Sequence, residues 1–539
     1  MALAAVPLAF LAVFFGMPVA GMLARGFLQG GHLDLGAMVE VLTRPRTLRI
    51  LWFTLWMATL ATVLTVVLGL PVAYALYRLR LPGRRLLRAL VVMPFVLPSV
   101  VVGVAFRTLL ASNGPLGFLG LDGSWVAILA ALVFFNLAVV VRTVGGTWEG
   151  LDRRAEESAA ALGAPPVRVL RTVTVPALLP SIVSAATVVF LFCATAFGVV
   201  LTLGGLRYGT VETEIYLLTT QFLDLRAASV LSILQLLAVV LLLTVAGRTR
   251  ARKERALRRG AVTANLRAPA RSDIPSLLVT GLVLVFVALP LAAMVGRSLQ
   301  VGDGWGLDNY RALGNPDATT ALLVPVWTAL HNSFAAAVDA TMIALTLGLI
   351  VSVLVSRRPR GRVGRRAVGA LDGIVMLPLG ISAVTVGFGF LITLDRPPLD
   401  LRSSAVLIPI AQAMVALPLV VRTLVPAMRA IDPRLRQAAA TLGASPVRAA
   451  LAVDLPLVWR PLLAATGFAF AVSLGEFGAT SFLSRPQRPT LPVVIYQLIS
   501  RPGPENFGMA LAGSVVLCVV TVAVMGAVER LRVGSMGTF

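Results

Sequence analysis

The sequence contains one polar segment twice. Residues 157–168 read ESAAALGAPPVR, and residues 437–448 read QAAATLGASPVR, 280 positions further along the chain. In each copy a proline follows the glycine thirteen positions later, at Pro176 and at Pro456. Both segments are flanked by long apolar stretches. A single copy fits an ordinary connector between helices as well as it fits a docking segment, but a duplicated one indicates two equivalent docking points for a partner with two-fold symmetry.

The apolar composition predicts an integral membrane protein. The 539 residues are 58% hydrophobic and 13% charged, whereas a soluble chain carries roughly a quarter charged residues. The apolar runs are long enough to cross a bilayer as helices, so we expect an all-α chain with about 12 transmembrane helices. The expected spans are 3–23, 49–76, 89–110, 125–141, 178–202, 228–247, 275–295, 327–355, 369–393, 404–421, 461–483 and 508–528.

The basic residues are explained by membrane topology. The formal net charge of +23 comes mainly from arginines in short loops beside the apolar runs, so we do not expect the chain to bind nucleic acid. Arginines are dense after the second, sixth and eighth spans, and sparse in the loops between. The positive-inside rule therefore places both termini and both polar segments in the cytoplasm.

The repetition extends beyond the polar segments. Phe197-Gly198 matches Phe477-Gly478 at the same 280-residue offset, and Gly103 matches Gly387 at 284. We therefore predict two parallel, homologous halves of six helices that form one pore, joined by a basic and flexible cytoplasmic linker. The predicted parts are residues 1–247, 248–274 and 275–539, with the polar loops at 151–176 and 431–456.

The residues of the loops predict a helix, a sharp bend and a second short helix. The alanine runs favour helix. Gly163 and Gly443 stand where a glycine ends a helix in the left-handed region. Ser445-Pro446 has the pattern of a cap followed by a first-turn proline.

The two loops resemble the signature loop of importer permeases of the ATP-binding cassette (ABC) class. That loop reads Glu-Ala-Ala, three residues, Gly, nine residues and Ile-x-Leu-Pro; Gln437 replaces its glutamate in the second copy. The resemblance implies a type I ABC importer fold, in which both loops form coupling helices that sit in clefts of two cytosolic ATPase subunits. The residues implied to couple are Glu157, Ala159, Gly163, Pro166, Arg168, Pro176, Gln437, Ala439, Gly443, Pro446, Arg448 and Pro456.

Fused permeases of this class include importers of thiamine or its phosphates and importers of ferric iron. The stretch from Phe197 to Tyr216 resembles the thiamine permeases more closely, with the iron(III) permeases next. The resemblance implies a bacterial inner-membrane protein that works by alternating access and receives its solute from an extracytoplasmic binding protein. A secondary transporter with twelve spans is a remote alternative, since it needs no duplicated loop.

Prolines, glycines and one carboxylate mark candidate pore or gate positions. Proline and glycine interrupt helices where a cavity or a neighbouring helix satisfies the backbone, although close packing of small residues explains them equally well. Glu476 is expected inside the eleventh span, where an ionisable group lines the path or forms a structural hydrogen bond. The candidates are Pro94, Pro98, Gly103, Phe197, Gly198, Pro378, Gly387, Glu476, Phe477 and Gly478.

The small numbers of cysteine, histidine and lysine residues argue against metal binding, catalysis and ATP binding by this chain. The two cysteines, Cys193 and Cys518, and the two histidines, His32 and His331, are all isolated in apolar or loop sequence. We therefore expect no metal site, no catalytic residues and no enzyme activity in this chain. Lys253 follows an arginine, so no Gly-Lys-Ser/Thr phosphate loop exists. ATP and Mg²⁺ are therefore expected to bind to the partner ATPase subunits, and no cofactor to this chain.

Overall fold

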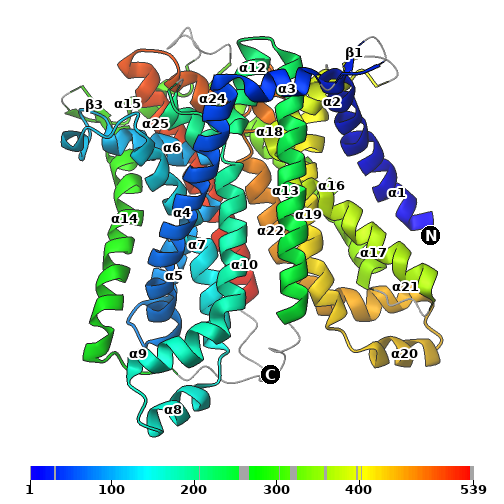
Figure 1. The fold of residues 1–539 in the computed structure, drawn as a ribbon. Coiled ribbons are helices and arrows are strands. Elements are labelled where there is room, and N and C mark those ends of the chain that lie inside the picture. The colour runs from blue at the N-terminus through cyan, green and yellow to red at the C-terminus, as the bar shows by residue number, and fades with distance from the viewer. Residues whose placement is uncertain are drawn as a thin grey trace. The chain divides into compact units, whose positions relative to one another are not determined.

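The computed structural model of the chain describes residues 2–29, 32–34, 36–205, 207–253, 266–302, 304–315, 324–356, 361–395, 399–401 and 404–533. These residues are mostly helical, as the ribbon in Figure 1 shows. The strands among them form two short antiparallel ribbons. They are β1 (Leu28–Gln29) with β2 (His32–Leu33), and β3 (Gln300–Val301) with β4 (Gly304–Trp305).

The chain forms two compact units. Unit 1 consists of Met1–Val41, Ile215–Leu236 and Leu299–Phe539, and unit 2 consists of Leu42–Glu214 and Leu237–Ser298. Three of the four boundaries fall within helices, namely α3 (Gly36–Thr43), α12 (Val211–Thr220) and α13 (Leu225–Lys253), so each of these helices contributes to both units.

Unit 2 is built around the long helix α4, which packs against α7, α10 and α14. A matched glycine allows this close packing: a Cβ at Gly69 of α4 would lie 2.7 Å from Cγ1 of Val140 on α7. The helices that lie wholly within unit 2 are α4 (Pro45–Arg78), α5 (Arg84–Val96), α6 (Ser99–Leu110), α7 (Trp125–Glu149), α8 (Arg153–Ala161), α9 (Pro166–Val169), α10 (Val175–Ala194), α11 (Gly198–Gly204) and α14 (Ile274–Ser298).

Unit 1 repeats this arrangement around α16, which packs against α19 and α22. A Cβ at Gly348 of α16 would lie 2.5 Å from Cγ1 of Val420 on α19. Unit 1 contains α1 (Ala2–Leu11), α2 (Met17–Phe27), α3 (Gly36–Thr43, which continues into unit 2), α15 (Asp308–Ala312), α16 (Val326–Ser356), α17 (Arg362–Met376), α18 (Ala383–Thr393), α19 (Leu407–Arg429), α20 (Pro433–Thr441), α21 (Pro446–Ala449), α22 (Leu455–Leu474), α23 (Thr480–Leu483), α24 (Leu491–Ile499) and α25 (Pro504–Val533).

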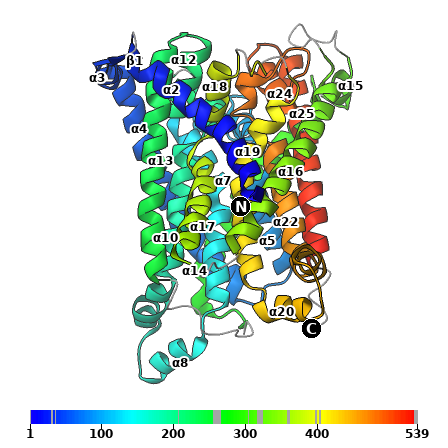
Figure 2. The same cartoon turned by 90° about the vertical axis from the view of Figure 1, so that its right-hand side faces the viewer.

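The first helix of each predicted half belongs to the unit built by the other half. Helix α2 lies against α18 within unit 1, as Figure 2 shows, and the Phe14 and Phe390 rings are 6.0 Å apart. Within unit 2, Phe286 of α14 lies 6.0 Å from Phe106 of α6. The two compact units therefore do not coincide with the two halves of the sequence repeat. The halves 1–247 and 275–539 stay a prediction that rests on the repeated sequence.

The membrane-spanning character of the chain is confirmed, with ten or eleven candidate spans in place of the expected twelve. Among the residues that the structure describes, ten helices are long and apolar enough to cross a bilayer. Helices α5 and α6 pass this test only together and are bent by 105° relative to each other, so they add an eleventh span if the pair crosses as one broken span and not as a re-entrant loop. The ninth expected span, 369–393, is divided into α17, a 3₁₀ turn at Leu377–Gly380 and the short apolar helix α18.

Two expected spans end earlier than the hydrophobic pattern indicates. The run 178–202 breaks after Ala194 and resumes as α11, and the run 461–483 breaks after Leu474 and resumes as α23. Hydropathy does not register these breaks, because the residues on both sides are apolar and only the backbone direction changes.

The described parts of the predicted linker 248–274 have regular structure or contacts to unit 2, and its role as a linker stays a prediction. Helix α13 continues to Lys253, and residues 266–273 contact the end of α4. Arg267 makes two backbone hydrogen bonds there, donating to the Arg78 carbonyl at 3.1 Å and accepting from the Arg80 N–H at 2.9 Å. Its guanidinium lies 2.5 Å from the Asp273 carboxylate. Residues 254–265 of the predicted linker lie outside the described residues.

Candidate functional site: the two repeated polar loops

Each polar loop begins with a capped helix. The carboxylate of Asp152 accepts the N–H of Arg154 at 2.9 Å at the start of α8, and Asp432 accepts the N–H of Arg434 at 2.9 Å at the start of α20. The first N–H groups of a helix have no partner within it, so these aspartates fix where the two helices begin.

The predicted bend lies at the predicted glycines. Gly163 has φ +82° and Gly443 has φ +80°. The N–H of Gly163 donates to the carbonyl of Ala160 at 2.9 Å, and the N–H of Ala164 donates to the carbonyl of Ala159 at 3.1 Å. The second loop has the same two bonds at 3.0 Å each. This pair of bonds is a Schellman motif, which ends a helix and requires the left-handed conformation at the glycine.

The second short helix also forms in both loops. Pro446 opens α21, as predicted for a first-turn proline, and Pro166 opens α9 in the same way. The Ser445 hydroxyl accepts the N–H of Arg448 at 3.3 Å, which confirms the predicted cap.

A π-helical turn joins each short helix to the long helix that follows. These turns are Leu170–Thr174, which leads into α10, and Ala450–Asp454, which leads into α22. Pro176 and Pro456 lie in the first turn of the long helices. The two loops therefore share one backbone course, element for element, at an offset of 280 residues.

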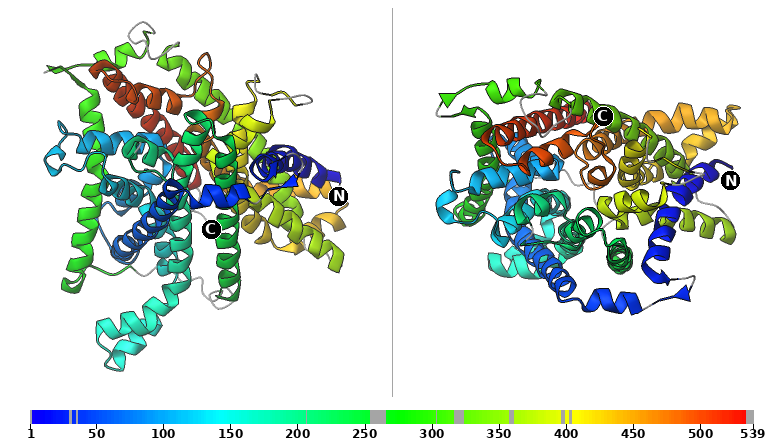
Figure 3. Two further views of the ribbon diagram at one scale, coloured as in Figure 1. Left: turned by 45° about the horizontal axis from the view of Figure 1, so that its top comes forward. Right: turned by 90° about the horizontal axis from the view of Figure 1, so that it is seen from above.

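The outer face of each loop carries an exposed leucine. Leu162 is 89% exposed and Leu442 is 87% exposed. Helix α8 projects beyond the long helices of its unit (Figures 1 and 3), and Leu162 directly follows its last residue. We call the exposed leucines Leu162 and Leu442 the tips of the two loops. Glu157 is exposed and lies 3.7 Å from Arg153 on the same helix. Its counterpart Gln437 is also exposed.

The remaining coupling candidates divide between the two faces. Arg168 and Arg448 are exposed, whereas Ala159 and Ala439 are partly buried. The loops thus present an apolar tip and basic side chains outward, and a small alanine face inward. None of these observations tests the docking role, which stays a prediction.

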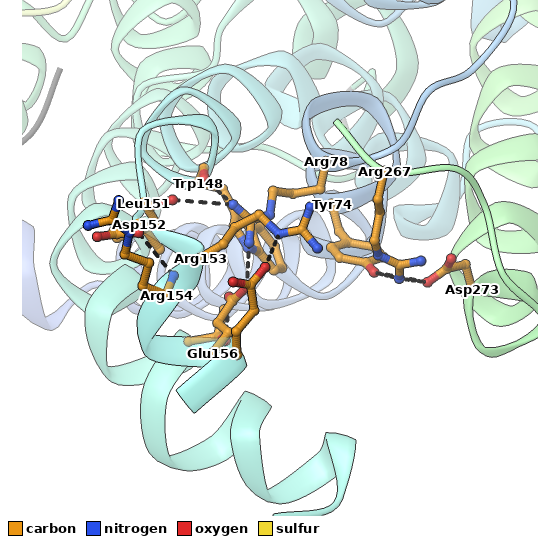
Figure 4. A network of polar contacts seen from close by, with 12 residues as sticks. Tyr74, Arg78, Trp148, Leu151, Asp152, Arg153, Arg154, Glu156, Arg267 and Asp273 are labelled. Carbon is orange, nitrogen blue, oxygen red and sulfur yellow. Dashed lines mark hydrogen bonds and ion pairs between the residues drawn. The ribbon is translucent and has the colours of Figure 1, made fainter. Parts of the chain in front are cut away.

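The inner face of the first loop is held by a polar cluster that sequence reasoning missed. Glu156 of α8 accepts the hydroxyl of Thr174 at 2.9 Å and pairs with the guanidinium of Arg78, at the end of α4. Figure 4 shows Arg78 reaching from α4 to this carboxylate. The Nη1 atom of the Arg78 guanidinium lies 3.4 Å from the carbonyl oxygens of Trp148 and Leu151.

The inner face of the second loop has a pair at the same two positions. Arg436 of α20 lies 2.6 Å from the carboxylate of Asp454, the last residue of the π-helical turn. Arg436 corresponds to Glu156, and Asp454 to Thr174, at the 280-residue offset. The 280-residue offset could have identified these four residues from the sequence. They were missed because the residue types at matched positions differ between the two loops.

The pore candidates of unit 2 mark a bend and a close helix contact. Pro94 is buried near the end of α5, and Pro98 precedes α6, so the predicted kink is confirmed. A Cβ at Gly103 would lie 2.6 Å from the Cβ of Thr202 on α11. Phe197 is buried, and Gly198 begins α11 directly after it. Gly103 therefore serves close packing, and nothing here tests whether these residues line a pore.

The candidates of unit 1 have the same character. Pro378 lies in the 3₁₀ turn that interrupts the ninth expected span. A Cβ at Gly387 would lie 2.7 Å from the Cα of Ala479, and one at Gly478 would lie 2.9 Å from the Cβ of Ala383. The ring of Phe477, also a candidate, is buried and lies 5.4 Å from that of Tyr496. The glycines thus allow two backbone segments to approach closely.

Glu476 does not lie inside a membrane-spanning helix. It follows the end of α22, and its carboxylate accepts the N–H of Ala479 at 2.7 Å and that of Thr480 at 3.0 Å. The side chain is only 6% exposed. Glu476 therefore organises the break between α22 and α23, which favours the structural alternative considered from the sequence.

Metal-binding groups are not gathered in the part of the chain that the structure describes. There, no cluster of three or more His, Cys, Asp or Glu residues has an arrangement that would hold a metal ion. Cys193 and Cys518 are both buried and free.

Comparisons with known proteins show that the chain resembles transport permeases over nearly its whole length. Residues 65–258 match the family described as binding-protein-dependent transport system inner membrane component. The thiamine transport system permease ThiP of Brucella abortus is 28% identical over 553 residues, which cover 97% of this chain and 96% of that protein. ThiP of Escherichia coli is 29% identical, covering 83% of this chain and 82% of that protein.

A shorter relative has higher identity. The sulfate transport system permease CysT of Salmonella typhimurium is 34% identical over 212 residues, which cover 38% of this chain and 76% of that protein. The chain belongs to the family of binding-protein-dependent transport system inner membrane components.

Proposed function

We propose that this chain is the permease of a thiamine importer and that it carries thiamine or its phosphates across the bacterial inner membrane. The observation that carries the proposal is the similarity to thiamine permeases over 97% of this chain, which includes both loops. The sulfate permease is similar over only 38% of the chain. No observation favours the ferric-iron importer that the sequence left open, so iron enters as a control substrate.

The energy for transport comes from separate ATPase subunits in this proposal. The two loops have the same backbone and the same exposed leucine, at Leu162 and Leu442, so they offer equivalent contacts to two ATPase subunits. These subunits bind ATP and Mg²⁺, because the sequence has no phosphate loop of its own. We propose that Glu157, Arg168 and their counterparts contribute the polar contacts around each leucine.

The orientation in the membrane follows from the arginine distribution. Both loops and both termini face the cytoplasm in this proposal, where the ATPases are. A solute-binding protein delivers thiamine to the opposite face. Closure of the ATPases on ATP displaces both loops, and the long helices α10 and α22 that follow them turn the pore outward. The chain itself forms and breaks no covalent bond.

Uptake into vesicles tests the proposal. The chain is reconstituted with the ATPase and the binding protein encoded beside it, and ATP is enclosed on the side of the loops. We expect uptake of labelled thiamine that requires ATP and the binding protein, with no uptake of ferric iron or sulfate. Uptake of iron or sulfate in place of thiamine would refute the assigned substrate.

The coupling contacts are tested in the same vesicles. Leu162→Glu and Leu442→Glu place a charge at each exposed tip, and we expect each to reduce ATP-dependent uptake and binding of the ATPase. Leu119→Glu is the matched control, because Leu119 is an exposed leucine of unit 2 outside the loops. An equal loss in all three variants would contradict the docking role of the tips.

A further inference from the structure

On its inner face each loop has one polar contact between two of its own side chains, which we call a tie. The two ties lie at equivalent positions, although their residues differ. In the first loop Glu156 accepts the Thr174 hydroxyl at 2.9 Å. In the second loop Arg436 contacts the Asp454 carboxylate at 2.6 Å. Each contact joins the first helix of the loop to the last residue of the π-helical turn, 18 residues further along the chain.

These ties lie where each loop would otherwise be a hinge. Between the tied residues the backbone contains the left-handed glycine, a four-residue helix and a π-helical turn. Short helices of this kind have few hydrogen bonds of their own, and a π-helical turn interrupts the regular pattern. A contact that closes this segment removes its freedom to bend, so that the first helix and the long helix move together.

Burial makes the ties stronger than surface contacts. The Asp454 side chain is 13% exposed and Arg436 is 31% exposed. Thr174 is buried, and the Glu156 side chain is 23% exposed. Partners that are shielded from water lose more when they are separated than exposed ones, because a charge or a polar group is then left without compensation.

The first tie has an additional anchor. Glu156 carries a charge that Thr174 does not neutralise, and Arg78 at the end of α4 supplies the opposite charge. The backbone carbonyl of Arg78 in turn accepts the N–H of Arg267, from the segment before α14. The second tie is an ion pair between two residues of the loop itself. The first loop is thus fixed to α4, whereas the second is closed on itself.

We propose that Glu156 with Thr174, and Arg436 with Asp454, are positioning residues that make each loop one rigid body with the long helix that follows it, α10 or α22. This inference rests on the proposed function, because the rigid body transmits the displacement that the ATPases impose. A loop whose tie is broken still contacts its ATPase but bends at the glycine and the π-helical turn. ATP hydrolysis then continues with less solute moved.

Charge reversal in the second loop tests the tie without the partners. A spin label at Ala440→Cys, an exposed site on α20, reports the mobility of the helix in the purified chain. We expect Arg436→Asp and Asp454→Arg each to increase label mobility severalfold. We expect the double variant Arg436→Asp/Asp454→Arg to restore it, because the pair is re-formed with its charges exchanged.

Matched controls separate the tie from a general effect of charge. Arg434→Asp changes an exposed arginine of the same helix by the same amount, and we expect no change in mobility. If a reversal variant fails to fold, Asp454→Asn and Arg436→Gln replace it, since they break the pair without introducing repulsion. Unchanged mobility in variants that keep their melting temperature would overturn the proposal, as would a double variant no less mobile than the singles.

Transport then tests the consequence of the tie. In vesicles with the ATPase and the binding protein, we expect each single reversal to lower thiamine uptake per ATP hydrolysed severalfold while ATP hydrolysis persists, and the double reversal to recover it. Absence of thiamine uptake by the unaltered chain would refute the proposed substrate but leave the mobility result intact. A normal uptake ratio in the single variants would refute the tie alone.

Discussion

Replacement of Gly163 by alanine should open the bend of the first loop. The glycine has φ +82°, and a Cβ added there would meet no atom within 4 Å. The cost is therefore backbone strain alone, about 1–2 kcal/mol for a residue with a side chain in the left-handed region. Alanine also restricts the open state, which offsets about 0.4–1 kcal/mol. The closed bend is therefore destabilised by about 1 kcal/mol relative to the open one, which corresponds to a roughly fivefold larger open population.

Hydrogen exchange measures this population directly. The N–H groups of Gly163 and Ala164 are held by the two bonds of the Schellman motif, so their exchange requires the bend to open. We expect roughly fivefold faster exchange at these amides in Gly163→Ala, and a smaller change in Gly163→Asn, because asparagine tolerates the left-handed region better. Gly443→Ala should behave in the same way in the second loop.

A glycine in a regular helix provides the control. Gly146 of α7 also has open space around it but does not have a positive φ, so Gly146→Ala should leave the exchange of the loop amides unchanged. Equal exchange in Gly163→Ala and the unaltered chain would refute the reasoning, since it would mean that the left-handed conformation does not hold the bend.

Two further predictions concern unit 1. Glu476→Ala should lower the melting temperature more than Glu476→Gln. Alanine leaves the buried N–H groups of Ala479 and Thr480 without an acceptor, which costs about 1–3 kcal/mol for each group, whereas glutamine keeps one acceptor oxygen. Equal shifts of the melting temperature would argue against the cap. Gly387→Ala should destabilise unit 1 by about 1–3 kcal/mol, because its Cβ would lie 2.7 Å from a backbone atom. The control Gly281→Ala, in α14 of unit 2, has open space and should not destabilise the chain, since alanine favours a helix over glycine; thermal unfolding of the two variants decides this.

Local structure in the loops could be predicted well from the sequence. Gly163 and Gly443 end helices in the left-handed region, and Ser445 caps the helix that Pro446 opens. Each of these features depends on residues within five positions, and few residue types fit them. The kink at Pro98 was predictable for the same reason, since proline constrains its own turn.

Contacts between distant segments could not be predicted in the same way. The position of α2 beside α18 joins residues more than 350 positions apart, and no local pattern at Pro18 or Gly389 indicates which helix it meets. The break that places Glu476 outside a span escaped prediction because a carboxylate among apolar residues has the same hydropathy whether it lies in a helix or caps one. Only the positions of the Ala479 and Thr480 N–H groups distinguish the two cases.

The ties were missed because a repeat of position differs from a repeat of residue type. A left-handed bend needs glycine, so Gly163 and Gly443 are alike. A tie needs only a donor and an acceptor within reach, and Glu156 with Thr174 meets this need as well as Arg436 with Asp454 does. The same geometry therefore tolerates a reversal of charge between the two loops. It follows that matched positions with unlike polar residues are informative in a duplicated chain, because the backbone sets where the contact lies and leaves its chemistry open.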